Sequence, residues 1–192
     1  MYALMDYPEV VEETLQSIWR VSKKAAEITA ESSATFFLSW EDTSTTNISP
    51  QYYRDYILPE INMWCDILHQ NGKYYIQHAC GHLDALLEDI AKSNIDVLES
   101  VSPAPTGNVT MTRVQEALPK HIAVIGGIEP VLLLNASTDE VAEQGKELMD
   151  TMQQRGYVLA NSDSCPPGVQ IEKFQRLSQI AKEYVMPRRT AY

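Results

Sequence analysis

Three residues of the chain carry side chains that bind zinc in other proteins. His78 and Cys80 are separated by a single residue, and Cys165 lies much further along the chain, directly before Pro166. One imidazole and two thiolates are a ligand set that suits zinc, and three protein ligands leave the fourth tetrahedral position open, as in catalytic sites. The residue types therefore predict a zinc site formed by His78, Cys80 and Cys165.

The alternative interpretation is that these cysteines are ordinary apolar residues, because free cysteine is among the most buried residue types. Cys65 fits that description, since it lies in the middle of a predicted helix and is expected in the core. The other two cysteines differ because each follows a predicted strand, residues 73–77 before Cys80 and residues 157–160 before Cys165. Parallel barrels carry their chemistry at the carboxyl ends of their strands, so this position favours a functional site.

Four carboxylates share the predicted strand ends. Glu41 and Asp163 are candidate catalytic groups, as a fourth zinc ligand, a proton acceptor or an orienting group for Cys165. Glu99 and Glu129 are candidate contacts to a substrate. Each also has an ordinary interpretation, as a solvated loop carboxylate, a helix cap or a turn residue.

The elements that would position these residues alternate along the chain. Apolar periodicity predicts helices over 8–30, 49–70, 83–92, 110–118, 138–155 and 170–184, and short apolar runs predict strands over 35–38, 73–77, 96–99, 121–125 and 157–160. Thr138 is predicted to cap its helix. This alternation indicates parallel βαβ units in an α/β fold, and no Gly-x-Gly-x-x-Gly follows a strand to favour dinucleotide binding. A complete barrel needs about 250 residues, so we expect a partial (β/α)8 TIM barrel of about five βα units from its C-terminal part.

Composition narrows the class of protein and of partner. The 192 residues predict one domain over 1–192, and the net charge of −11 argues against nucleic acid or an anionic membrane as a partner. No apolar run is long enough for a transmembrane helix, and the first residues do not resemble a secretory signal, so a cytoplasmic location is expected. The odd number of cysteines, three, argues against a disulfide framework.

The chain resembles the uroporphyrinogen decarboxylase superfamily and, within it, the cobalamin-dependent methyltransferases of the methylcobamide:coenzyme M type. The resemblance lies in five stretches taken in order: residues 48–53, 58–59, 72–81, 125–130 and 165–167. It implies a barrel, a zinc site on His78, Cys80 and Cys165, and a corrinoid cofactor carried by a partner protein. It also implies a further N-terminal part with the first strands, so we expect a truncated barrel that a second copy or another chain completes.

Three functions are consistent with these features. The first is zinc-dependent methyl transfer between a corrinoid protein and a thiol or a methylated donor. The second is decarboxylation of a porphyrinogen, which the superfamily also contains and which the scarcity of Lys and Arg, 15 in all, disfavours. The third is a non-catalytic half barrel that binds zinc or a corrinoid protein.

Overall fold

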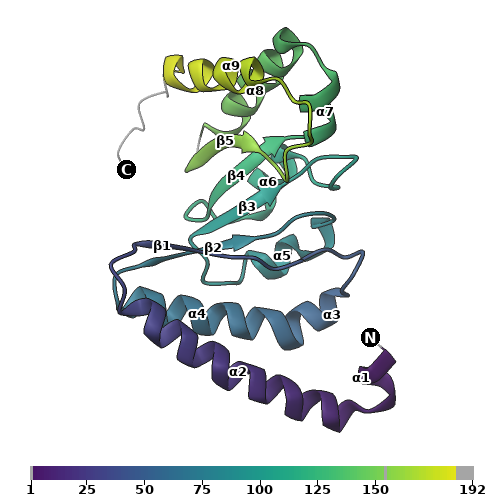
Figure 1. Cartoon of the computed structure of the whole chain (residues 1–192), viewed down its shortest axis with the longest axis vertical. Helices are drawn as coiled ribbons and strands as arrows, with labels where there is room; N and C mark the ends of the chain where they lie inside the picture. Colours follow the sequence, from purple (N-terminus) through teal and green to yellow (C-terminus); the bar gives the residue numbers. More distant parts are fainter. Residues whose placement is uncertain (1, 154, 185–192) are drawn as a thin grey trace.

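Five parallel strands form one sheet in the order of the chain (Figure 1). A computed structural model describes residues 2–153 and 155–184. The strands are β1 (Phe36–Ser39), β2 (Tyr74–His78), β3 (Val97–Val101), β4 (Ala123–Ile128) and β5 (Tyr157–Asn161). Neighbouring strands are joined through helical segments, which confirms the predicted α/β fold of a partial barrel.

The helices lie at both ends of this sheet and behind it. Figure 1 shows α2 and α4 at one end of the long axis, and α8 and α9 at the other. None of the described helices is long and apolar enough to cross a membrane. The helical elements are α1 (Tyr2–Asp6), α2 (Pro8–Ala30), α3 (Pro50–Tyr52), η1 (Tyr53–Ile57), α4 (Leu58–Gln70), η2 (Asp84–Leu86), α5 (Leu87–Ile90), α6 (Met111–Ala117), α7 (Pro130–Asn135), α8 (Thr138–Met152) and α9 (Ile171–Glu183).

The two faces of the sheet have different environments. Tyr75, Leu98 and Val124 are buried in the main core, against side chains of α4, α5 and α6. Their strand neighbours point the other way because side chains alternate along a strand. On that second face Phe36 is 62% and Tyr74 45% exposed, and their rings stack with centroids 5.2 Å apart. The described residues therefore leave the inner face of the partial barrel uncovered near β1.

A second, smaller core lies beside β4 and β5. It is formed by Ile128, Leu133, Val141 and Leu177, which come from β4, α7, α8 and α9. Cys65 belongs to the main core and is fully buried on α4, as predicted. Apolar periodicity predicted the helix α2, but Val10, Ile18 and Val21, which carry this pattern, are 63%, 53% and 70% exposed.

Several predicted boundaries are corrected by the structure. Thr138 is the first residue of α8 rather than its cap; Ser137 is the cap, because its hydroxyl accepts from the Glu140 amide while the Glu140 carboxylate accepts from the Ser137 amide. This helix ends at Met152 rather than at Arg155, and residue 154 lies outside the described residues. The predicted strand over 121–125 runs instead from Ala123 to Ile128, and the short helix α7 was not predicted.

Candidate active site

The best-defined contact at the strand ends joins His78 to Glu99. His78 ends β2, and the parallel register places it opposite Glu99 of β3. The two side chains lie on the inner face of the sheet, with Nδ1 of His78 2.6 Å from Oε2 of Glu99. This contact engages Nδ1, so Nε2 of the imidazole is the nitrogen left for a metal or a substrate.

The surroundings of His78 favour its protonated form. The hydrogen bond to Glu99 raises the pKa of His78 above its ordinary value, and the charges of Glu99, Asp163 and Glu41 raise it further. Partial burial acts in the opposite direction and lowers the pKa. The indole of Trp40 lies against the imidazole, with ring centroids 4.9 Å apart. His78 is therefore held from two sides, by a carboxylate and by an aromatic ring.

Cys80 lies in the segment after β2, and hydrogen bonds from the loop after β1 hold this segment in position. The hydroxyl of Ser44 accepts from the amide of His82, and the amide of Thr45 donates to the His82 carbonyl. Gly81 has a φ of +75°, and a Cβ at this position would lie 2.6 Å from Oγ of Ser44. Only glycine fits a left-handed backbone at such close approach. The turn after Cys80 therefore depends on Gly81.

The thiol of Cys80 is half-buried in acidic surroundings. Burial raises the pKa of Cys80, and the nearby carboxylates of Asp163, Asp42 and Glu99 raise it further. A neutral thiol is thus favoured over a thiolate. A cation bound beside these groups would reverse that preference, because the thiolate is the form that ligates metals.

The loop after β5 carries Asp163 and Cys165, and serine contacts anchor its start. Ser162 is fully buried; its carbonyl accepts from Oγ of Ser100 at 2.5 Å, and its hydroxyl lies 2.7 Å from that of Ser102. Ser100 adopts a φ of +72°, where the register between β3 and β4 shifts. This irregularity in β3 therefore fixes the start of the loop relative to the end of β3.

Cys165 does not join His78 and Cys80 in the described conformation. Its thiol is exposed, and Sγ lies 3.7 Å from the carbonyl oxygen of Pro166. Across residues 2–153 and 155–184, no three His, Cys, Asp or Glu side chains converge closely enough to hold a metal ion. The residues still fit zinc in their chemistry, since a carboxylate that orients a ligating histidine is the usual arrangement around such ions. The predicted ligand set stays a prediction, and it requires the loop with Cys165 to close toward Cys80.

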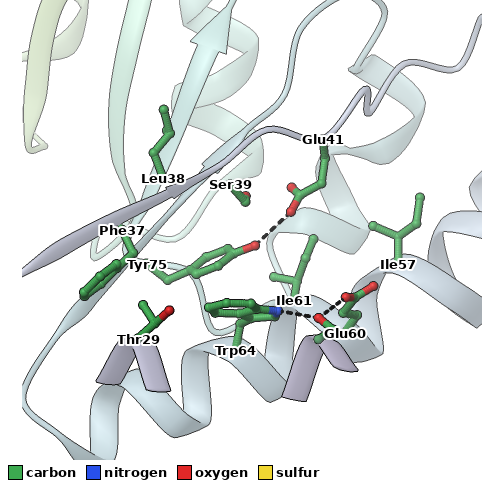
Figure 2. A pocket seen from close by; sticks show the side chains of 11 residues that line it. Thr29, Phe37, Leu38, Ser39, Glu41, Ile57, Glu60, Ile61, Trp64 and Tyr75 are labelled. Atoms are coloured by element: carbon green, nitrogen blue, oxygen red, sulfur yellow. Dashed lines mark hydrogen bonds between the residues drawn. The ribbon is translucent and has the colours of Figure 1, made fainter. Parts of the chain in front are cut away.

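Glu41 lies on the opposite side of β1 from His78. Its Oε1 accepts from the hydroxyl of Tyr75 at 2.8 Å, and Tyr75 faces the helices (Figure 2). Burial raises the pKa of Glu41, and its Oε2 is buried without a hydrogen-bond partner. In this arrangement Glu41 is directed toward a pocket among the helices rather than toward the predicted zinc ligands. Trp40 is the residue of this segment that reaches His78.

Glu129 has a structural role in the described conformation. It is 3% exposed, its Oε2 accepts from the Leu132 amide at 2.8 Å, and its Oε1 accepts from Thr106 at 2.5 Å. Glu129 thus caps the N-terminus of α7, and its contact with Thr106 holds the loop after β3 against the end of β4. Both oxygens are engaged, so a substrate would have to replace an existing hydrogen bond.

Sequence reasoning placed Glu99 at the correct edge but missed its role beside His78. It also missed Trp40 as the aromatic neighbour of that histidine. The signal for the first pair was available, because His78 directly follows one predicted strand, Glu99 ends the next, and parallel neighbours in register lie side by side. In the structure Glu99 lies in the middle of β3. No pattern in the sequence indicates that Trp40, rather than Glu41, turns toward His78.

Comparison with protein families identifies a relationship over most of the chain. The family model described as Uroporphyrinogen decarboxylase (URO-D) matches residues 1–184. A comparison with curated proteins found no significant match.

Proposed function

Because the chain belongs to the uroporphyrinogen decarboxylase family, we propose that it transfers a methyl group between a corrinoid protein and a thiol or a methylated donor. His78, Cys80 and Cys165 would hold a zinc ion at the strand ends. Bound there, zinc would supply Lewis acidity, keeping a thiol substrate as its thiolate or polarising a methylated donor. The observation that carries the proposal is the His78–Glu99 pair beside Cys80, the arrangement expected of a ligating histidine and its supporting carboxylate.

The residues around the site have separable tasks in this proposal. Glu99 orients the imidazole of His78 and keeps Nε2 directed away from β3. Trp40 packs against that imidazole and restricts its orientation. Asp163 precedes Cys165 by two residues and acts electrostatically on both His78 and Cys80, so it is suited to accept a proton from an incoming thiol.

A direct activity test uses methylcobalamin as the methyl donor and coenzyme M as the thiol. The proposal predicts formation of the methyl thioether, measured by mass spectrometry, together with loss of the methylcobalamin absorbance. Cys80→Ala should abolish product formation. Cys65→Ala removes a thiol from the core instead and should retain it. Product from the Cys80→Ala protein at the wild-type rate would contradict the proposal.

Decarboxylation is the second candidate, and the matched family model favours it by its description. A porphyrinogen carries several carboxylates, which require positive charges in the site that binds them. The groups that act on Cys80 are instead the carboxylates of Asp163, Asp42 and Glu99. This acidic environment would repel such a substrate. Release of carbon dioxide from a porphyrinogen without added zinc would favour decarboxylation over methyl transfer.

We also propose that a second copy or another chain covers the inner face near β1. Trp40 is 79%, Phe36 62% and Tyr74 45% exposed there, which is unusual for large apolar side chains on a barrel's inner face. Analytical ultracentrifugation of the chain alone separates the possibilities. A dimer would indicate self-association, and a monomer that binds a corrinoid protein would indicate a different partner. A monomer that binds neither would favour a non-catalytic remnant.

A further inference from the structure

A pocket lies on the helical side of β1, away from the strand-end site. It has a volume of about 440 Å³, which is within the range of small-molecule sites. Its walls come from α2, β1, the loop after β1, the η1–α4 helix and β2. The residues that line it are Ser22, Thr29, Phe37, Leu38, Ser39, Glu41, Ile57, Glu60, Ile61, Trp64 and Tyr75.

Two carboxylates line this otherwise largely apolar pocket. Glu60 accepts a hydrogen bond from the hydroxyl of Ser22, which in turn accepts from Nε1 of Trp64 at 2.9 Å. Glu41 accepts from Tyr75, and its second oxygen is buried without a partner. None of the ion pairs among the described residues involves either glutamate. Two carboxyl groups therefore face one pocket, and no ion pair among the described residues neutralises either of them.

Both carboxylates lie on one side of the pocket, which also holds the apolar side chains of Ile57 and Ile61 (Figure 2). Figure 2 shows the polar ends of Tyr75 and Trp64 directed toward the side that holds Glu41 and Glu60, and Phe37 and Thr29 on the other side. The rings of Trp64 and Tyr75 are tilted by 38° with centroids 6.5 Å apart. Aromatic faces attract cations, and carboxylates do so more strongly.

We propose that this pocket binds a small organic ammonium ion, with its charged nitrogen between Glu41 and Glu60 and its apolar body against Trp64, Tyr75 and Phe37. The Ser39 hydroxyl lies close enough to act on the Glu41 carboxyl but donates to the Ile76 carbonyl at 3.4 Å, and Oε2 of Glu41 is buried with no donor within hydrogen-bond distance. The ligand is therefore an amine that retains N–H groups rather than a quaternary ammonium ion. The mutual repulsion of Glu41 and Glu60, which contributes to the raised pKa of Glu41, is relieved by such a cation. The predicted zinc ligands His78, Cys80 and Cys165 do not line this pocket, although the charges of Glu41 and His78 act on one another.

Isothermal titration calorimetry with three matched probes tests the proposal. The probes are 2-phenylethylammonium, the neutral 2-phenylethanol, and phenyltrimethylammonium, which has a positive charge but no N–H group. The first should bind, and the other two should bind at least about tenfold more weakly. Equal binding of 2-phenylethanol would show that charge plays no role. If phenyltrimethylammonium binds as tightly as 2-phenylethylammonium, the buried Oε2 of Glu41 does not contribute to binding. No binding of 2-phenylethylammonium would overturn the proposal.

Variants locate the bound ion. Glu41→Gln with Glu60→Gln should weaken binding of 2-phenylethylammonium at least about tenfold, whereas Glu88→Gln, which removes an exposed charge on α5, should not. Circular dichroism confirms that the double variant is folded. Should it be unfolded, saturation-transfer NMR on the wild-type protein gives a second measurement: contacts from the probe must reach the indole of Trp64. Contacts confined to Trp19 or Trp40 would overturn the proposal.

Discussion

Nδ1 of His78 and Oε2 of Glu99 lie 2.6 Å apart on two parallel strands that are in register at these residues. The register places the carboxylate beside the imidazole without any loop rearrangement, so the pair is a property of the sheet itself. Such a pair fixes the ring orientation and raises the basicity of the nitrogen that remains available. Zinc binding at His78 should therefore depend on Glu99.

Replacing Glu99 with Gln keeps the size of the side chain and removes its charge. We expect zinc affinity, measured by competition with a chromogenic chelator, to fall by about 10- to 100-fold. Glu88→Gln serves as the control, because it removes a charge from the exposed side of α5. An unchanged zinc affinity in the Glu99→Gln protein would show that the His78–Glu99 pair does not contribute to metal binding.

Gly81→Ala tests the turn that positions Cys80. The substitution places a Cβ 2.6 Å from Oγ of Ser44 on a backbone with φ of +75°. Gly72→Ala is a matched control, because its φ is +68° but a Cβ there meets nothing within 4 Å. Each variant should lose about 1–2 kcal/mol of unfolding free energy from the left-handed backbone, and Gly81→Ala should lose more. Urea denaturation measures both, and equal losses would show that the contact with Ser44 is unimportant.

Arg155 stabilises the end of α6 from inside the protein. It is 1% exposed, and its guanidinium donates to the carbonyls of Leu118 at 2.8 Å and Ile122 at 2.9 Å. Burial lowers its pKa. Arg155→Met should lose about 2–4 kcal/mol of unfolding free energy, because buried carbonyls are left without donors. Arg20→Met, at an exposed position on α2, should lose little, and similar losses in both would contradict this role.

Glu41 should give the stability of the protein a specific pH dependence. Burial raises the folded-state pKa of Glu41 above its ordinary value of 4.5, so folding favours the protonated acid. That contribution is fully present below pH 4.5 and is lost as the pH rises through the folded pKa. The unfolding free energy of Glu41→Gln minus that of the wild type should therefore increase with pH across this interval and then level off. A difference that is constant from pH 4 to 8 would contradict the assignment.

The sequence was sufficient to predict the alternation of strands and helices because apolar periodicity distinguishes the two kinds of element, although apolar residues of α2 and β1 are exposed. It placed Cys65 in the core and His78 at a strand end, and both positions are confirmed. It could not place Glu41, because the direction of a side chain just beyond a strand depends on tertiary partners, here Tyr75. Likewise Glu129 is a helix cap because α7 begins at Pro130. This helix has six residues, too few for a recognisable apolar period, so the cap could not be predicted.

The predicted zinc ligands illustrate the same limit. Only Ala79 separates His78 from Cys80 at the end of β2, so their proximity follows from local structure. Cys165 lies on the loop after β5, and β3 and β4 separate that strand from β2 within the sheet. The distance between Cys165 and the other two residues therefore depends on the curvature of the sheet, which a local pattern of residues does not report.

The most direct measurement is the zinc content of the purified protein, by inductively coupled plasma mass spectrometry, after expression in zinc-supplemented medium. We expect one zinc ion per chain in the wild type and in the controls Cys65→Ala and His121→Gln. We expect loss of zinc from His78→Gln and from the double variant Cys80→Ala with Cys165→Ala. Wild-type protein without stoichiometric zinc, or zinc retained by the double variant, would contradict the proposed zinc site.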